Sequence, residues 1–379
     1  MEKEKRRDEA IEMGRFIRLD LNESPFDIPE AVKRSIVSRI LNVPFNRYYL
    51  PPREAEREPG GMGGWGIDAL CERLGEMNGV SPDCILLGNG SDEIILLLAI
   101  WVARACGQDG APGRVVVPVP TFGQYSSAAE AAGARLLEVP SMDDFRFDSE
   151  ALCRAARDEA PTIVFLCRPN NPTGSSCDLE VVRRLLDTGA MVVVDEAYYE
   201  FSKTTVANWL AREQRLFVLR TMSKAWGLAG LRLGYLMGES RFIKELRRIK
   251  PVFNIDVVTQ AVALQVLSRP ELMERAVERI VCEREWLEQR LGEIPGVCIL
   301  PSETNFILFH TPYPAARVWD GLRSRGVIVR RFESPRLSHH LRVTLGTRRE
   351  NQAFVDAMHG VIRELGGGDA PRLEVGKGG

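Results

Sequence analysis

The segment TMSKAWGLAGLRLGY begins at Thr221, directly after an apolar run expected to form a strand. Its Lys224 carries an amine that condenses with aldehydes, and the hydroxyls of Thr221 and Ser223 flank it. Arg232 follows Lys224 by eight residues and offers a planar group suited to a phosphate dianion. Because most lysines are simply solvated at the surface, this segment alone leaves that reading open.

Two further polar segments follow apolar runs. RPNNPTG, at 168–174, is a rigid turn that would present the Asn171 amide. DEAY begins at Asp195, a carboxylate that can keep a pyridine nitrogen protonated, the form in which pyridoxal phosphate is an electron sink. Asp195 could also be an ordinary helix cap. A carboxylate, an amide, a tyrosine, a lysine and an arginine, all placed just after strands, nevertheless favour one shared site.

The elements that must position these residues alternate between strand and helix patterns. Helices are expected at 92–105, 123–132, 149–158 and 179–188, and strands at 85–87, 114–119, 135–138, 162–166, 191–194, 216–219 and 232–237. Runs such as 115–117 and 192–194 are apolar on both faces, as in a mostly parallel sheet covered by helices. The sequence therefore predicts an α/β fold whose ligands bind where the strands end.

A smaller α+β domain is expected after residue 250. Its helices are predicted at 257–267, 271–291, 315–325 and 350–364, and its strands at 305–309, 327–330 and 340–345. We expect an N-terminal arm and part of the small domain over 1–45, a large domain over 46–270, and the C-terminal small domain over 271–365. The Gly-rich tail, 366–379, is expected to be disordered.

Composition excludes several classes of protein. The formal net charge is −2, so no broad positive field favours nucleic acid. The longest apolar run, 94–103, has ten residues, about half of a membrane span, and the charged stretch 2–9 argues against a secretory signal. The eight cysteines include no C-x-x-C pair and indicate reduced thiols in a cytoplasmic protein.

Neither a metal centre nor a dinucleotide site is expected. The four histidines show no metal-binding spacing, and the adjacent His339 and His340 would point to opposite faces of a strand. Gly61, Gly63 and Gly66 match G-x-G-x-x-G, but a charged, Pro-containing loop precedes them where that motif needs a buried strand. We interpret these glycines as part of a flexible loop.

The order NNPTG, DEAY and SKAWGLAGLRLGY resembles the fold-type-I pyridoxal-phosphate aminotransferases, and most closely the histidinol-phosphate aminotransferases. The resemblance extends over residues 19–364. Supporting motifs are LNESP at 21–25, NRY at 46–48, GNGSDE at 88–93, PTFGQY at 120–125, TNFIL at 304–308 and LRVTLGT at 341–347. It implies a large domain with a mostly parallel seven-stranded sheet and a smaller α+β domain.

The resemblance also implies roles for individual residues. Lys224 would bind the cofactor aldehyde and then move the proton between the substrate Cα and the cofactor C4′. Asp195 would pair with the pyridinium nitrogen, with catalytic Tyr198 and Asn171 on the phenolic oxygen and Phe122 stacked on the ring. The cofactor phosphate would be held by the backbone of Ser91 and Asp92 at a helix N-terminus, and by Thr221, Ser223 and Arg232.

Further implied residues concern the substrate and the partner subunit. Arg342 matches the clamp for the substrate carboxylate, Arg330 the contact for a substrate phosphate, and Asn22 a substrate contact in the LNESP motif. Tyr48 matches a tyrosine donated to the partner's cofactor, which implies a homodimer with shared active sites. The sequence departs from the family at Ser24, usually asparagine, and in the Pro- and Gly-rich insertion at 50–64.

The expected activity is transamination between histidinol phosphate and 2-oxoglutarate, or in reverse between glutamate and imidazole-acetol phosphate, in histidine biosynthesis. Its substrates are small molecules, either an amino acid or an amino-alcohol phosphate, and no nucleic-acid or membrane partner is expected. An aromatic amino-acid aminotransferase and a threonine-phosphate decarboxylase of the same fold remain alternatives. A catalytically silent ligand-binding protein is a third, which the intact set of Lys224, Asp195, Asn171, Tyr198 and Arg232 argues against.

Overall fold

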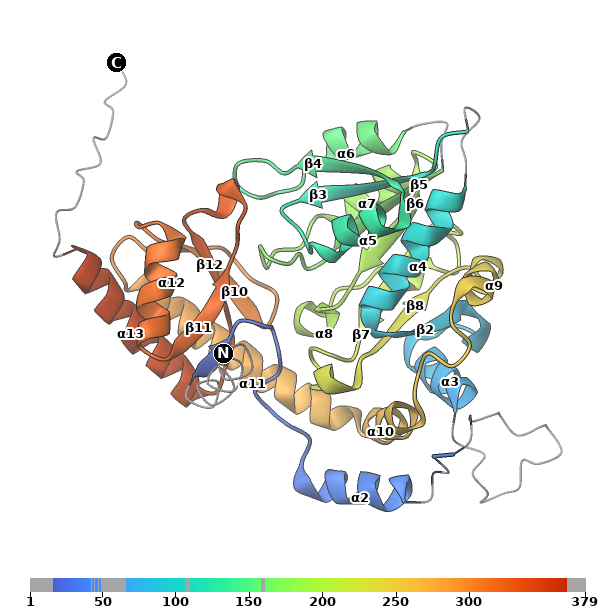
Figure 1. Cartoon of the computed structure of the whole chain (residues 1–379), viewed down its shortest axis with the longest axis horizontal. Coiled ribbons are helices and arrows are strands. Elements are labelled where there is room, and N and C mark those ends of the chain that lie inside the picture. The colour runs from blue at the N-terminus through green and yellow to red at the C-terminus, as the bar shows by residue number, and fades with distance from the viewer. Residues whose placement is uncertain are drawn as a thin grey trace, which may run out of the picture. The chain divides into compact units, whose positions relative to one another are not determined.

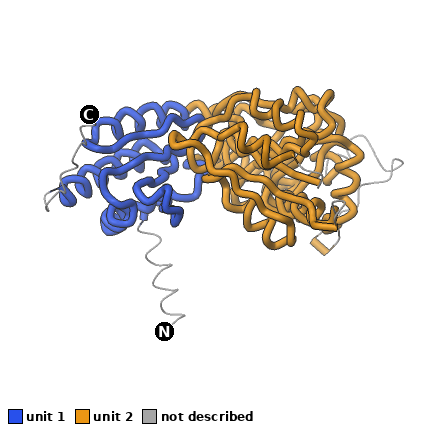
Figure 2. The backbone as a smooth tube through the Cα atoms, turned by 90° about the horizontal axis from the view of Figure 1, so that it is seen from above, with its two compact units in different colours: residues 1–25, 279–379 blue, residues 26–278 orange. Residues whose placement is uncertain are grey.

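The computed structural model describes residues 16–41, 43, 45–46, 48, 66–105, 110–157 and 161–366. The chain divides into two compact units, coloured separately in Figure 2. The large unit is Phe26–Glu278, and the small unit combines Met1–Pro25 with Arg279–Gly379. The whole 50–64 insertion, with Gly61 and Gly63, and the tail after Gly366 lie outside the described residues.

A seven-stranded sheet organises the large unit, in the order β2-β8-β7-β6-β5-β3-β4. Strand β8 is antiparallel to β2 and β7, and the other pairs are parallel. The predicted mostly parallel sheet is therefore confirmed. The strands are β2 (Ile85–Asn89), β3 (Arg114–Val119), β4 (Arg135–Pro140), β5 (Thr162–Cys167), β6 (Met191–Asp195), β7 (Leu216–Thr221) and β8 (Leu233–Met237).

Helices cover both faces of this sheet, because alternate residues of each strand are buried on opposite sides. Val192 and Val194 of β6 join one hydrophobic cluster, whereas Val193 between them is buried on the other face. The cluster is completed by α2 (Glu30–Ile40), α3 (Ile67–Asn78), α6 (Ser149–Ala156), α7 (Leu179–Leu186) and α10 (Val257–Leu267). Helices α4 (Gly90–Arg104) and α5 (Gln124–Ala132) pack against each other and against the sheet (Figure 1).

The unit boundaries differ from the sequence-based ones at 45 and 270. Helix α2 belongs to the large unit, because its Val32 and Ile36 are buried in the same cluster as α3 and α10. The second boundary, after Glu278, falls inside α11 (Pro270–Gly292), a continuous helix that starts in the large unit and ends in the small one.

The small unit contains a five-stranded sheet in the order β1-β11-β12-β10-β9. Strand β1 (Ile17–Leu19) is parallel to β11 (Val327–Arg331), which attaches the N-terminal segment to the C-terminal part of the chain. The remaining pairs are antiparallel and join β12 (His340–Thr344), β10 (Phe306–His310) and β9 (Cys298–Ile299). Helices α12 (Ala315–Ser324) and α13 (Arg348–Gly366) complete the unit (Figure 1).

Several elements have no counterpart among the sequence predictions, including β1, β9, α2, α3 and α9 (Ser240–Ile249). Strands β1 and β9 have only three and two residues, too few for a periodic pattern to show. None of the helices in the described part of the chain has the length and apolar character needed to span a bilayer.

Candidate active site

The polar segments singled out in the sequence meet at one edge of the seven-stranded sheet. Strands β3, β5, β6 and β7 are parallel, so their carboxyl ends share an edge. Strand β8 runs the other way, so it starts at that edge, and β2 ends there, with Asn89 opposite Leu233 and Thr221 opposite Gly234. This edge collects Ser91, Asp92, Phe122, Asn171, Asp195, Tyr198, Thr221, Ser223, Lys224 and Arg232.

An anion cup forms where β2 leads into α4. The helix begins at Gly90, so the backbone N–H groups of Ser91 and Asp92 lie in its first turn, where the helix dipole favours an anion. Arg232 reaches the same turn: its Nη2 donates to the Asp92 carboxylate at 2.6 Å. Beside it the hydroxyl of Thr221 donates to Ser223 Oγ at 3.0 Å. The donor set suits a phosphate dianion.

Two glycines leave the room that this cup needs. Gly90 has a φ of 76°, and a Cβ added to it would lie 2.5 Å from Arg232 Nη2. A Cβ on Gly234 of β8 would lie 2.5 Å from the backbone nitrogen of Ser91. Any larger residue at either position would therefore displace a group that lines the cup.

Asp195 ends β6 as a carboxylate that is only 2% exposed. Its Oδ1 accepts a hydrogen bond from the Ala197 N–H at 3.0 Å, and its Oδ2 accepts one from the Tyr125 hydroxyl at 2.6 Å. Burial raises the pKa of Asp195 to about 6, although both hydrogen bonds act to lower it. A buried carboxylate of this kind suits a cationic ring nitrogen, which would favour its ionised form.

The side chain of Asn170 ties the turn after β5 to a neighbouring strand. The buried Asn170 amide donates to the Pro120 carbonyl at 3.0 Å and accepts from the Thr121 hydroxyl at 2.8 Å. These bonds tie the turn to the end of β3, and the half-buried Asn171 follows directly. The sequence motif contains both asparagines, but the contacts of Asn170 with Pro120 and Thr121 come from residues about 50 positions away and cannot be read from the motif.

Lys224 lies half-buried in the turn after β7, with the buried Ser223 before it. Tyr198, 3% exposed, precedes α8 (Tyr199–Ser202) at the neighbouring strand end. The structure thus places the predicted lysine, carboxylate and tyrosine in the loops that follow two adjacent parallel strands.

A buried ion pair that cannot be read from the sequence lies at the base of these loops. Both Arg220 Nε and Nη2 donate to Glu196 Oε2, at 3.0 and 2.8 Å, and the two side chains are 5% and 0% exposed. The Arg220 guanidinium also lies 3.6 Å from the Tyr199 ring centroid. Because Glu196 follows Asp195 and Arg220 precedes Thr221, the pair joins the carboxyl ends of β6 and β7. The sequence shows both charges but not their burial.

Tyr48 lies in the large unit and is 73% exposed. Its ring stacks on Phe253, with centroids 4.2 Å apart. Leu41 and Phe45 just before it are 80% and 68% exposed, and Val252 is 73% exposed. Large apolar side chains gathered in this way are typical of protein interfaces.

The small unit brings the predicted substrate residues together. Arg330 and Arg342 are directly opposite each other on β11 and β12. Arg342 is 6% exposed and its Nη2 donates to the Asp20 carbonyl at 2.7 Å. Nearby, the buried Asn22 side-chain oxygen accepts from the Thr344 hydroxyl at 3.1 Å. Three basic or amide side chains thus lie on neighbouring strands and on the segment after β1.

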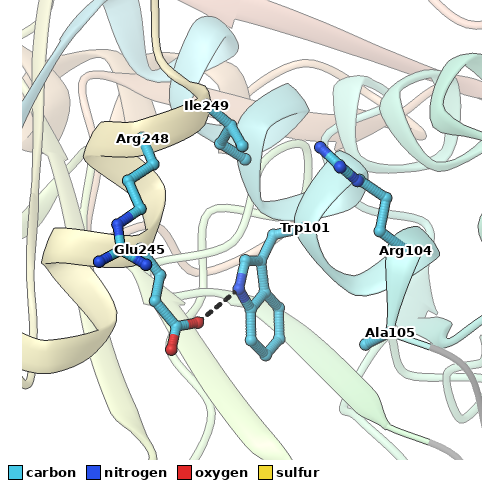
Figure 3. A pocket seen from close by; sticks show the side chains of 6 residues that line it. All are labelled: Trp101, Arg104, Ala105, Glu245, Arg248 and Ile249. Carbon is cyan, nitrogen blue, oxygen red and sulfur yellow. Dashed lines mark hydrogen bonds between the residues drawn. The ribbon is translucent and has the colours of Figure 1, made fainter.

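A pocket of about 370 Å³ lies elsewhere in the large unit, at the C-terminal ends of α4 and α9 (Figure 3). Trp101 donates to Glu245 there at 2.9 Å, and Arg104 and Arg248 flank the pair. The 15 residues of α4 separate it from the anion cup by about 22 Å. Both arginines lie at helix ends, where they offset the helix dipoles, so they indicate no particular ligand.

The histidines do not form a metal centre in the described residues. His339 precedes β12, and the His310 ring lies 5.7 Å from His339 and 5.2 Å from His340, measured between centroids. Within the described ranges, no group of three or more His, Cys, Asp or Glu side chains could hold a metal ion.

Comparison with known proteins confirms the predicted resemblance. Residues 15–358 match the model of the family "Aminotransferase class I and II". Histidinol-phosphate aminotransferase of Thermococcus gammatolerans is 37% identical over 365 residues, 95% of each chain. The Sinorhizobium meliloti histidinol-phosphate aminotransferase, solved with pyridoxal-5'-phosphate, has a TM-score of 0.81 and 26% identity over 94% of each chain. L-threonine-O-3-phosphate decarboxylase of Porphyromonas gingivalis shares the fold, with a TM-score of 0.74 and 20% identity over 91% of this chain and 99% of that one. This protein belongs to the class I and II aminotransferases.

Proposed function

We propose that the protein is a pyridoxal-phosphate-dependent histidinol-phosphate aminotransferase, which transfers the amino group of histidinol phosphate to 2-oxoglutarate to give imidazole-acetol phosphate and glutamate, or catalyses the reverse reaction. The observation that carries this proposal is the single sheet edge at which an anion cup, a buried carboxylate and Lys224 follow neighbouring strands. The curated relative that covers 95% of both chains bears the name of this reaction.

The residues at this edge fit pyridoxal phosphate from one end to the other. The Ser91 and Asp92 N–H groups, Arg232 and the hydroxyls of Thr221 and Ser223 would hold the phosphate. Asp195 would pair with the pyridine nitrogen. When bound, the cofactor supplies an electron sink for the bond that breaks at the substrate Cα and carries the amino group between the two substrates.

The remaining residues at the edge orient the ring and move the proton. Phe122 would stack on the ring face, while Asn171 and Tyr198 donate to its phenolic oxygen. Lys224 would bind the aldehyde through its amine. The same amine would move the proton at the substrate Cα, since the half-buried Lys224 lies at the sheet edge whose residues would hold the cofactor.

The substrate assignment rests on the small unit. Arg342 would bind the carboxylate of an amino-acid substrate such as glutamate, and Arg330 would bind the phosphate of histidinol phosphate. Asn22 would hydrogen-bond a polar group of the substrate. An aromatic aminotransferase would have no use for Arg330, whereas a threonine-phosphate decarboxylase would need a similar arginine pair and differs in which bond breaks at Cα.

The proposal includes a homodimer in the cytoplasm. Tyr48 would serve the cofactor of the partner subunit, which requires its exposed segment to be covered by a second copy. The exposure of Leu41, Phe45 and Val252 around it supports such an interface. The seven cysteines within the described ranges are free thiols, as in proteins of reducing compartments.

Borohydride labelling tests the cofactor assignment. The purified protein should be yellow, and reduction should fix the cofactor on Lys224, as shown by peptide mapping. Lys250 is the internal control, because burial lowers the pKa of its amine. A label on Lys250, or none, would refute the proposal. Lys224→Ala should abolish turnover and leave the fold intact.

A further inference from the structure

The Tyr125 hydroxyl donates a hydrogen bond of 2.6 Å to Asp195 Oδ2. The two residues are 70 positions apart in the chain and are 0% and 2% exposed. Tyr125 lies in the first turn of α5, whereas Asp195 ends β6, so the contact crosses from a helix to the sheet. No motif spacing relates these positions.

The ring of Tyr125 is held on two sides. It stacks on Phe165 of β5, with centroids 4.9 Å apart and planes inclined by 6°. The Phe122 ring lies nearly perpendicular to it, with centroids 5.6 Å apart and planes inclined by 88°. Since Phe122 is the residue that would stack on the cofactor ring, Tyr125 connects that residue to the carboxylate that would hold the ring nitrogen. The hydroxyl is therefore presented to Asp195 by packing that does not depend on the hydrogen bond.

The two hydrogen bonds leave each carboxylate oxygen of Asp195 able to accept one more donor. Each carboxylate oxygen has two lone pairs, and Ala197 and Tyr125 each occupy one. The bond from Tyr125 also opposes the effect of burial, which raises the pKa of Asp195 to about 6. Without the hydroxyl, the carboxyl would keep its own proton to a higher pH and would pair less well with a protonated pyridine nitrogen.

The other groups near Asp195 do not replace this donor. The negative charges of Asp92 and Glu196 raise its pKa further, and both are paired, with Arg232 and Arg220. Cys167 lies opposite Asp195 on β5, and burial raises the pKa of its thiol, which therefore stays neutral.

We propose that Tyr125 is a positioning residue, which keeps Asp195 ionised and correctly oriented for the pyridine nitrogen of the cofactor. The inference rests on the proposed function, because it assigns Asp195 to that nitrogen. It adds a residue that would not touch the cofactor and would act only through the carboxylate.

The test is the binding of pyridoxamine 5'-phosphate to the Tyr125→Phe apoenzyme, measured by fluorescence across pH. This ligand forms no bond with Lys224, so its dissociation constant reports on the ring and phosphate contacts alone. We expect the constant to rise by about tenfold to a hundredfold over wild type near pH 6, the scale of a lost hydrogen bond to a charged group. The ratio of the variant's dissociation constant to that of wild type should approach one above about pH 8.5, where Asp195 is ionised in both proteins.

Two comparisons separate this role from general support of the fold. Tyr235→Phe removes another buried hydroxyl, one that faces Arg220 and Asn78, and should leave the pH dependence of binding unchanged. In an Asp195→Asn background, adding Tyr125→Phe should have little further effect, because no carboxylate remains to ionise. The proposal would be overturned if Tyr125→Phe and Asp195→Asn weakened pyridoxamine phosphate binding additively. It would also be overturned if the ratio of the Tyr125→Phe dissociation constant to that of wild type did not change with pH.

A second variant covers the case in which Tyr125→Phe does not fold. 3-Fluorotyrosine placed at position 125 keeps the shape and makes the phenol a stronger donor, so pyridoxamine phosphate should bind more tightly than in wild type near pH 6. Unchanged binding would refute the role of Tyr125. Borohydride labelling of Lys224 is the independent check on the cofactor itself: a missing label contradicts the proposed function, whereas a normal label with unchanged binding contradicts only the role of Tyr125.

Discussion

Arg330 and Arg342 lie directly opposite each other on β11 and β12, and both guanidinium groups lie near the Phe332 ring, at 6.0 and 5.8 Å from its centroid. Directly opposed side chains share one face of a sheet, and like charges in that arrangement repel. An anion bound between them would remove the repulsion. Arg331, the neighbour of Arg330, instead lies 5.7 Å from the Trp319 ring centroid.

Arg330→Ala should lower the turnover of histidinol phosphate by about a hundredfold or more, the scale of a charge-assisted contact of about 3 kcal/mol. Glutamate turnover should fall less, because its distal carboxylate carries a single charge. Steady-state assays with histidinol phosphate, phenylalanine and threonine phosphate would measure this, with Arg331→Ala as the matched control. Unchanged turnover of the phosphate ester would favour the aromatic aminotransferase, and release of CO₂ from threonine phosphate would favour the decarboxylase.

Mixing two inactive variants tests the shared active site. If Tyr48 serves the partner's cofactor, a hybrid dimer of Tyr48→Phe and Lys224→Ala contains one site that carries neither lesion. Some activity should therefore return after the subunits exchange, and it should depend on the mixing ratio. Verified exchange without recovery would show that each chain builds its own site.

The pH dependence of stability should reveal Glu200, whose Oε1 accepts from Trp226 Nε1 at 3.1 Å. Burial raises the pKa of Glu200 from 4.5 to about 7. The folded state therefore binds this proton more tightly than the unfolded state, and the contribution of Glu200 to stability falls as pH rises from about 4.5 to 7. Glu200→Gln keeps the acceptor and should remove that fall.

The free energy of unfolding of Glu200→Gln should equal that of wild type near pH 4.5. At pH 8 it should be larger, by an amount on the order of 3 kcal/mol. Urea unfolding of the apoenzyme at the two pH values would measure it. The exposed Glu213→Gln serves as the control and should show no such difference between the two pH values. A Glu200→Gln variant less stable than wild type at pH 8 would contradict the prediction.

Gly90→Ala should weaken cofactor binding by about tenfold or more. Alanine at a φ of 76° is strained by about 1–2 kcal/mol, and its Cβ would displace Arg232 from the cup. Equilibrium dialysis with pyridoxal phosphate would measure the loss. Gly230→Ala is the matched control, because a Cβ there meets nothing within 4 Å. Equal binding by both variants would mean that the phosphate lies elsewhere.

The sequence predicts those features of the fold and of the site that are encoded in neighbouring residues. The apolar triplets 115–117 and 192–194 predict buried strands, since their burial on both faces is encoded in consecutive residues. Asp195 directly follows the second triplet and Lys224 follows the apolar run 216–219, so the sequence predicts both residues at strand ends. Each segment alone leaves an ordinary structural role open for these two residues, and it is their combination with the other polar strand-end residues that favours a shared site.

Only the tertiary structure brings together residues that are far apart in the chain. The bond from Tyr125 to Asp195, the burial of Arg220 with Glu196 and the opposition of Arg330 and Arg342 all depend on how elements pack and on strand register. The assignment of α2 to the large unit depends on which core receives Val32 and Ile36. Amphipathic patterns show that a face will be buried but not what will cover it, because that is decided by the packing of the whole chain.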